Sequence, residues 1–374
     1  MKNIYFLLVT ILIAAGCMTS YTRRPYADNL SNLAYISEPS AIYNNYSAID
    51  REALRKAIKN NLEYLESIDN DTEFNYGGRM VRAGDVARTQ RTFLQVIDHT
   101  VSEEMLGIIM EYMFEWYQAP GTDGRGKVVF TGYYVPEIEG SLSPSEKYRY
   151  PLYRPPKDLK KDSPYYTRGQ IDGLNVLEGK GFEIAWLADP VEAYFLHIQG
   201  SGTIKLPDGS MIGVHYSGNN GQPYISVGKF MMDKDLIRPK DGNVEGIKQY
   251  LRNNPDKLDD ILYQNPRYIF FKLTNSPAKG SLQVPLTPGH SIATDPSLFP
   301  RGGLSFIKTT SPVVGSSGKI DDWMDIQRFV VNQDEGAAIK GAGRVDLFWG
   351  EGPDAGKGAG FMKEEGELFF LLQK

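Results

Sequence analysis

The hydrophobic pattern of this 374-residue chain changes character at Val128. Before this residue, apolar side chains recur at helical spacing, most clearly across residues 54–65. After it, short runs of β-branched and aromatic residues, such as residues 128–134, alternate with turns rich in Gly and Pro. The sequence therefore predicts a mainly β fold with N-terminal helices, in a chain long enough for two domains.

Three helices are predicted in the N-terminal part. The first carries the apolar stripe of residues 54–65, and Asp85 is expected to cap a second helix that runs toward Ile97. Thr100 and Glu103 have the spacing of a capping box and predict a third helix that extends to Tyr117. These stripes are typical of ordinary core faces.

Turn residues divide the rest of the chain. Pro207-Asp208-Gly209 predicts a hairpin, and Asn219-Asn220-Gly221 is expected to separate its second strand from another at 224–227. We expect a long connection over 144–166, a helix over 243–253, a flexible loop over 350–358, and short strands from Gly280 to a last strand at 368–372.

The first residues have the pattern of an export signal. Lys2 precedes an apolar run over residues 4–15, which is too short for a comfortable membrane span and ends in Ala-Ala-Gly-Cys17. This ending resembles a bacterial lipoprotein processing site, at which the thiol of Cys17 receives a lipid. The alternative is a plain signal with a chance cysteine. Cys17 is the only cysteine, so no intrachain disulfide is possible.

Composition and motifs exclude several functions. A net charge of −5 argues against nucleic acid, and aromatic residues at 12% suit either a core or stacking on sugar rings. The four His residues lack paired metal-ligand spacing, residues 350–358 fail the phosphate-loop pattern, and no Gly-x-Ser-x-Gly elbow is present. We therefore expect neither a metal nor another cofactor.

Three Asp residues lie in Gly-punctuated, strand-like segments. Asp346 stands among aliphatic and aromatic residues, where desolvation raises the pKa of a carboxyl and lets it hold a proton for donation. Asp334 lies twelve residues upstream, and Asp295 precedes a proline. Asp beside Gly or Pro also serves simply to turn the chain, and for Asp334 and Asp295 both interpretations stay open.

Several segments resemble, in order, the membrane-bound lytic murein transglycosylase A family. They are residues 131–136 (TGYYVP), 197–202 (HIQGSG), 227–229 (VGK) and the three Asp segments, and the resemblance covers roughly residues 125 to 365. It implies a double-psi β-barrel domain, an inserted smaller β-barrel-like domain and a groove between them. The implied parts are a signal at 1–17, barrel segments at 18–136 and 276–374, and the inserted domain at 137–275.

The resemblance also implies roles for single residues. Asp346 matches the family's single catalytic acid and base, and Asp334 and Asp295 match its two supporting aspartates. Val135 stands where the family usually has Glu or Thr, a departure that affects no catalytic position. The implied contacts to substrate are Thr131, Tyr134, Gln199, Ser201 and Lys229.

The function implied is a lytic transglycosylase that cleaves the bond between N-acetylmuramic acid and N-acetylglucosamine and leaves 1,6-anhydromuramoyl ends. A hydrolase with two carboxylates and a non-catalytic polysaccharide-binding barrel are the alternatives. The partners expected are peptidoglycan glycan strands and a membrane reached through the lipid on Cys17, with other cell-wall enzymes as further candidates. Because Met18 rather than Asp follows Cys17, we expect the periplasmic face of the outer membrane.

Overall fold

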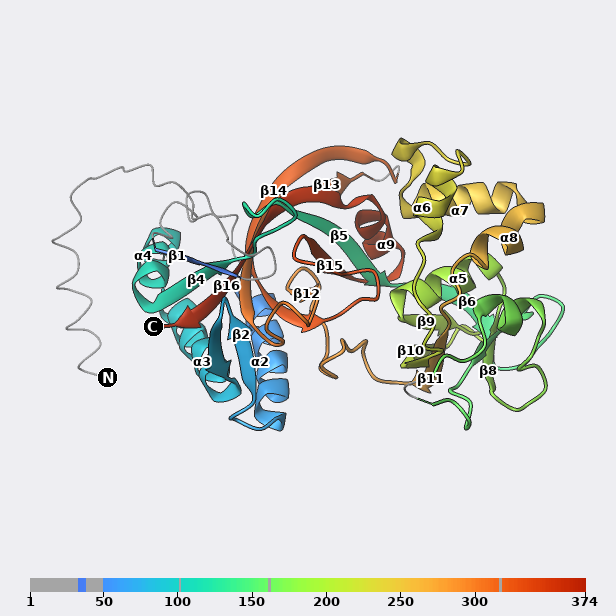
Figure 1. Ribbon diagram of the computed structural model, residues 1–374, viewed down its shortest axis with the longest axis horizontal. Coiled ribbons are helices and arrows are strands. Elements are labelled where there is room, and N and C mark those ends of the chain that lie inside the picture. The colour runs from blue at the N-terminus through green and yellow to red at the C-terminus, as the bar shows by residue number, and fades with distance from the viewer. Residues whose placement is uncertain (1–32, 38–49, 101, 161–162, 316–317) are drawn as a thin grey trace.

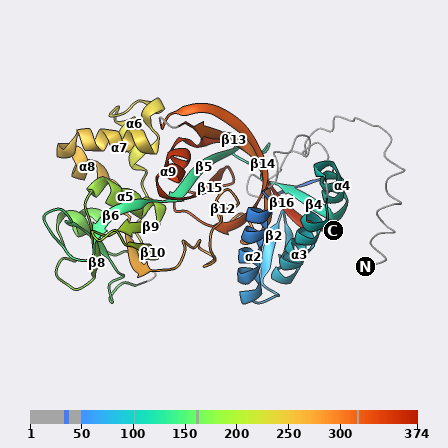
Figure 2. The same cartoon turned by 180° about the vertical axis from the view of Figure 1, so that it is seen from behind.

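The protein is described by a computed structural model that covers residues 33–37, 50–100, 102–160, 163–315 and 318–374. The predicted signal and Cys17 lie outside these residues. Within the described ranges, no helix has both the length and the apolar character needed to cross a membrane. Two lobes lie side by side along the long axis of the molecule, a large lobe built on an eight-stranded sheet and a small lobe built on a six-stranded sheet (Figures 1 and 2).

The large lobe contains a closed barrel of six strands. Its ring runs β16-β13-β14-β12-β15-β5, and it closes because the first half of β16 pairs with β5 while its second half pairs with β13. The pairs β12–β14 and β15–β5 are parallel, and the other pairs of the ring are antiparallel. The strands are β5 (Val128–Val135), β12 (Ser291–Ala293), β13 (Leu304–Val314), β14 (Ile320–Asp334), β15 (Arg344–Glu351) and β16 (Lys363–Gln373).

Short strands and four helices complete the large lobe. Strand β4 (Phe114–Gln118) extends the sheet from β16, and β1 (Ala34–Ile36) pairs with β4. Figure 1 shows α2 and α3 packed together below β4 and β16, and α9 at the other end of the barrel. These elements are α2 (Arg51–Ser67), α3 (Ala83–His99), α4 (Glu103–Met113), α9 (Gly352–Phe361) and the hairpin of β2 (Glu73–Tyr76) and β3 (Arg79–Arg82).

The small lobe is inserted between β5 and β12. Its sheet has the order β11-β10-β9-β6-β8-β7, and the two outer strands, β11 and β7, contact each other. Its strands are β6 (Glu137–Ser141), β7 (Tyr150–Tyr153), β8 (Glu183–Leu187), β9 (Ser201–Lys205), β10 (Met211–Asn219) and β11 (Ile269–Thr274). Its α-helices are α5 (Pro190–Gln199), α6 (Val227–Asp233), α7 (Val244–Asn253) and α8 (Leu258–Leu262).

Aromatic side chains fill the core of the large lobe. Trp116 is fully buried and packs edge-on against Phe306 and Phe369 from two barrel strands, with ring centroids 5.7 and 6.1 Å apart. Burial of one such side chain contributes roughly 1.5–3 kcal/mol to folding.

The structure confirms the predicted mainly β fold with N-terminal helices and a barrel. It also confirms the helices at 54–65 and 243–253 and the hairpin at Pro207-Asp208-Gly209.

Two predicted helix starts are wrong. Helix α3 begins at Ala83 after Arg82, so Asp85 lies in its first turn and does not cap it. Helix α4 is capped by Ser102, whose hydroxyl accepts a hydrogen bond from the N–H of Met105 at 3.1 Å, and not by Thr100. Asp98, Thr100 and Ser102 all stand near the start of α4, and spacing alone did not separate them, whereas α3 begins after Arg82 without any side-chain cap.

Other boundaries are corrected by tertiary packing. Helix α4 ends at Met113, and residues 114–118 form β4 because their aromatic side chains are buried against β16. The expected strand at 224–227 does not form, since Ser226 caps α6 there. The connection over 144–166 contains β7, the expected loop over 350–358 contains most of α9, and β13 and β14 are long rather than short, with 11 and 15 residues.

Candidate active site

Asp346 lies in the middle of β15, between β5 and β12. Its register partners are Thr131 on β5 and Ala293 on β12. The hydroxyl of Thr131 donates a hydrogen bond to Oδ1 of Asp346, and Nη2 of Arg344 donates to Oγ1 of Thr131 at 3.2 Å. Arg344 and Asp346 are two residues apart on one strand, so their side chains lie on the same face. The three side chains form one hydrogen-bonded chain.

The pKa of Asp346 is raised. Desolvation by burial is the largest cause, and it outweighs the hydrogen bond from Thr131 and the positive charge of Arg344, which both lower the pKa. A carboxyl in this environment holds its proton to higher pH than an exposed Asp, which is the property required of a general acid.

Asp334 ends β14 and is half-buried at the wall of the same groove. Its Oδ1 accepts hydrogen bonds from the backbone N–H groups of Ser281 and Glu335, each at 2.8 Å. Burial raises the pKa of Asp334 to about 6, although these two hydrogen bonds oppose the change. Asp334 therefore titrates close to neutral pH.

Tyr133 stands near both carboxyl groups. Burial raises the pKa of its phenol well above the ordinary value, and the charges of Asp334 and Asp346 raise it further. Its ring packs against Phe348, with the centroids 5.2 Å apart. The neighbouring Gly132 has to be glycine, because a Cβ atom there would lie 2.5 Å from Nε1 of Trp349.

Asp295 has a different environment. Its Oδ1 accepts hydrogen bonds from the N–H and hydroxyl of Ser297 at 3.1 and 2.7 Å, and its Oδ2 accepts one from the N–H of Gly341 at 2.8 Å. Burial alone would raise the pKa of Asp295, but these hydrogen bonds and nearby Lys340 outweigh it, and the pKa is lowered. Asp295 is not among the residues that line the groove. It ties the turn after β12 to the segment before β15.

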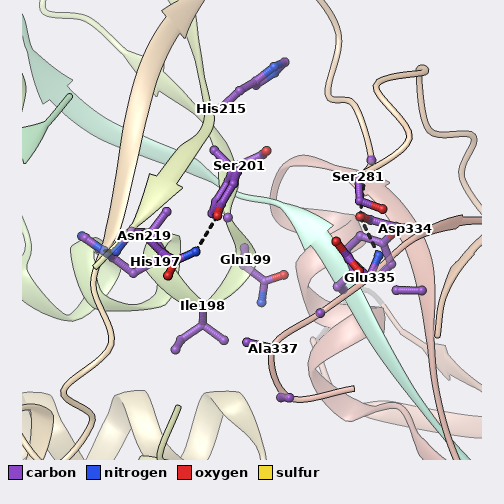
Figure 3. A pocket seen from close by; sticks show the side chains of 18 of the residues that line it. His197, Ile198, Gln199, Ser201, His215, Asn219, Ser281, Asp334, Glu335 and Ala337 are labelled. Carbon is purple, nitrogen blue, oxygen red and sulfur yellow. Dashed lines mark hydrogen bonds between the residues drawn. The ribbon is translucent and has the colours of Figure 1, made fainter. Parts of the chain in front are cut away.

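The groove has a volume of about 750 Å³ and is lined by both lobes. Figure 3 shows Gln199 and Ser201 of the small lobe across from Ser281, Asp334 and Glu335 of the large lobe. The carboxyl groups of Asp334 and Glu335 thus face polar side chains at the end of α5 and the start of β9. A groove of this size, with polar and aromatic walls, suits a chain of sugar rings.

Gln199 and Ser201 line the groove, as expected of substrate contacts. Gln199 ends α5, and its Oε1 accepts a hydrogen bond from the N–H of Tyr134 at 3.2 Å, which ties the small lobe to β5. Gly200 between them has φ of 77°, a left-handed conformation that ends the helix and lets β9 begin at Ser201.

Two expected substrate contacts lie elsewhere in the structure. The side chain of Tyr134 lies beside Gly356 of α9, and its pKa is raised by burial and lowered in part by the charge of Lys248. Lys229 lies in the first turn of α6, where its N–H donates to Oγ of Ser226 at 3.2 Å. Neither residue lines the groove. Thr131 also does not line it, and it reaches the site through Asp346.

Sequence reasoning assigned no role to Arg344, Tyr133 or Ser281. The spacing of Arg344 and Asp346 could have shown that both lie on one strand face. No local signal could have shown that the amide of Ser281 reaches Asp334, 53 residues away. In the part of the chain that the structure describes, no group of three or more His, Cys, Asp or Glu side chains could hold a metal ion.

Comparisons with known proteins agree with this geometry. The family model described as MltA specific insert domain matches residues 129–272, and the one described as 3D domain matches residues 290–372. The membrane-bound lytic murein transglycosylase A of Vibrio cholerae is 30% identical over 306 residues, which cover 80% of this chain and 81% of that protein.

Two solved structures have the same fold. The membrane-bound lytic murein transglycosylase from Agrobacterium tumefaciens matches with a TM-score of 0.72 at 25% identity, over 91% of this chain and 98% of that one. Escherichia coli MltA with bound chitohexaose matches with a TM-score of 0.74 at 23% identity, over 96% and 99% of the two chains.

Proposed function

Because this chain belongs to the membrane-bound lytic murein transglycosylase A family and is therefore a peptidoglycan-cleaving enzyme, we propose that Asp346 alone carries out the proton transfers of the reaction. The bond cleaved is that between N-acetylmuramic acid and N-acetylglucosamine, and the muramoyl product is a 1,6-anhydro sugar. The observation that supports this most is the raised pKa of Asp346, which lines a groove of about 750 Å³ between the two lobes.

The hydrogen-bonded chain on β15 and β5 favours one position for the proton. Arg344 is a donor only, so it uses a lone pair of Thr131 Oγ1, and the single hydroxyl proton of Thr131 is left for Oδ1 of Asp346. Oδ1 therefore acts as an acceptor, and Oδ2 is the oxygen that carries the acidic proton. Thr131 and Arg344 are positioning residues in this mechanism.

The reaction needs two proton transfers through this one carboxyl. Oδ2 of Asp346 protonates the glycosidic oxygen, the bond from that oxygen to C1 of the muramoyl residue breaks, and an oxocarbenium-like centre develops. The carboxylate then accepts the proton of the muramoyl C6 hydroxyl, whose oxygen bonds to C1 and closes the 1,6-anhydro ring. The proton lost in the first step is recovered in the second, and no water is consumed.

The substrate proposed is a peptidoglycan glycan strand. Gln199, Ser201 and Tyr224 line the small-lobe side of the groove and offer amide and hydroxyl groups to sugars. The chitohexaose bound by Escherichia coli MltA, a protein of the same fold, supports an extended sugar ligand for this chain too. We also propose that residues 18–136 and 276–374 form one domain and 137–275 the inserted one. A lipid on Cys17 would hold both on the periplasmic face of the outer membrane.

A hydrolase with two carboxylates is the second candidate, and one observation favours it. With a pKa of about 6, Asp334 is largely ionised near pH 7 and has the charge state of a general base for water. Against it, Oδ1 of Asp334 is already occupied by two backbone N–H groups. In the proposed mechanism Asp334 and Asp295 support the site, Asp334 through Tyr133 and Asp295 through the turn that it holds.

The products of cleavage in heavy-oxygen water separate the two candidates. Because the C6 hydroxyl is held in the same sugar as C1, its effective concentration exceeds that of an external reactant. We expect muramoyl ends that are non-reducing, lighter than hydrolysed ends by one water, and free of solvent oxygen in mass spectrometry. Reducing muramoyl ends that carry heavy oxygen as the main product would replace this proposal with the hydrolase.

A further inference from the structure

The groove is lined by more cationic than acidic side chains. Five cationic side chains and three acidic ones line it. Three of these eight already have partners: Arg168 pairs with Asp172 at 3.3 Å, Lys340 with Asp295 at 4.0 Å, and Glu335 with Arg301 at 3.0 Å. The remaining groups are Arg267, Lys272, Lys279, Asp334 and Asp346.

The cations among these remaining groups are uncompensated. Within the described part of the chain, Arg267, Lys272 and Lys279 take part in no ion pair with an acidic side chain. The two remaining acids, Asp334 and Asp346, are outnumbered by these three cations even when both are ionised. A local positive surplus thus stands in a chain whose net charge is −5.

The two lysines flank one short stretch of the groove. Lys272 on β11 is the cross-strand partner of His215 on β10. Burial lowers the pKa of His215, and the charges of Lys272 and Lys279 lower it further, so both lysines lie near a neutral imidazole. Lys279 is two residues from Ser281, whose N–H holds Asp334. Both lysines therefore lie near His215, and Lys279 is also close in the chain to the backbone group that binds Asp334.

We propose that Lys272 and Lys279 bind carboxylates of the peptide stem carried by the muramoyl residue, with Arg267 extending the same wall. This inference rests on the proposed function, since it names a further part of the same substrate. The sugar backbone offers only hydroxyls and acetamides, which need no cation. The carboxylates of a strand belong to its peptides, and ammonium and guanidinium groups pair with carboxylates through charge-assisted hydrogen bonds.

The test removes the charge once from the substrate and once from the protein. Soluble peptide-bearing strands are compared with the same strands after their stem carboxylates have been converted to amides. For the parent enzyme, we expect amidation to lower kcat/KM by about five- to tenfold, as for two partly exposed ion pairs. The Lys272→Gln/Lys279→Gln protein should show a similar loss on untreated strands and no further loss on amidated ones.

Lys180→Gln/Lys205→Gln is the matched control. Both of these lysines are exposed in the small lobe and neither lines the groove, so the double change removes the same charge from the protein but outside the groove. It should behave like the parent enzyme. If the parent cleaves untreated and amidated strands equally well, or if the Lys272/Lys279 variant still distinguishes them, the peptide-stem site is refuted.

A binding experiment keeps this inference separate from the proposed reaction. N-Acetylmuramoyl-L-alanyl-D-glutamate has no glycosidic bond to a second sugar, so its binding can be measured by calorimetry whether or not the enzyme is active. We expect it to bind the parent protein more tightly than its diamide, with a difference that shrinks as salt is added. If the parent protein binds the two compounds equally well, the peptide-stem site is refuted. If it binds them unequally but does not cleave glycan strands, only the proposed function is refuted.

Discussion

Replacement of Asp334 by Asn should stabilise the folded protein at neutral pH. Burial raises the pKa of Asp334 from 3.8 to about 6, so the folded state resists ionisation of this carboxyl. Asn keeps an oxygen that can accept the N–H groups of Ser281 and Glu335, and it carries no charge at any pH. The substitution therefore removes the cost of the buried charge and retains the local hydrogen bonds.

The size and pH dependence follow from linkage. A group whose folded-state pKa is raised contributes stability that is fully present below the unfolded pKa, here 3.8, and is lost as pH rises through the folded pKa, about 6. With about 1.4 kcal/mol per pKa unit, the upper limit at pH 7.5 is about 3 kcal/mol. Because the carboxyl faces an open groove, screening reduces our expectation to about 1–2 kcal/mol.

Urea unfolding of parent and variant from pH 3 to pH 8 measures this difference. The variant should be more stable at pH 7.5, and the two curves should converge below pH 4. Asp295→Asn is the control, and its effect on stability should have the opposite sign. Because the pKa of Asp295 is lowered in the folded protein, its ionised carboxyl stabilises the fold above the unfolded pKa, and this stabilisation is lost on acidification. A parent and an Asp334→Asn protein of equal stability at every pH would show that Asp334 is not held in a desolvated site.

Three further predictions concern catalysis and anchoring. Asp346→Asn should lower turnover by about 10²–10⁴-fold or more while glycan binding persists, and near-normal lysis would move the acid to another residue. Arg344→Gln removes a charge that lowers the pKa of Asp346, so the alkaline limb of the kcat/KM profile should move to higher pH, whereas Arg344→Lys should leave it nearly in place. Cys17→Ser should release soluble or unprocessed protein with full intrinsic activity in cell fractionation, and a processed variant retained on the membrane would contradict the lipid anchor.

Periodicity in the sequence was sufficient where an element is specified locally. The apolar stripe of α2 and the Pro207-Asp208-Gly209 turn are each determined by neighbouring residues in the sequence, and both form as predicted. Periodicity failed where packing between residues far apart in the sequence determines the structure. Gly358 reads as part of a loop, yet it belongs to α9, where a Cβ atom would lie 2.1 Å from the ring of Trp349. The close approach of helix and strand explains the glycine, and only the folded structure reveals it.

The candidate site was predictable in its residue types but not in its arrangement. Asp346 and Asp334 were recognisable as acids in strand-like segments, and both line the groove. Their different environments depend on parallel pairing of β12 with β14 and of β15 with β5, which joins segments far apart in the sequence. Asp295 precedes a proline, which left a turn open as one interpretation, and its partners Ser297 and Gly341 show that it does lie in a turn.

The position of the insertion links the small lobe to the chemistry of the barrel. The outgoing chain leaves along β5, which carries Thr131 against Asp346 and Tyr133 near both carboxyl groups. The returning chain reaches the barrel at Ser281, whose N–H holds Asp334. Both crossings thus set the environment of a carboxyl group, so a shift of the small lobe on substrate binding would change the pKa of Asp346, the proposed acid, and of Asp334. A barrel with its insert replaced by a short loop would keep Asp346 in its strand but would lose the opposite wall of the groove.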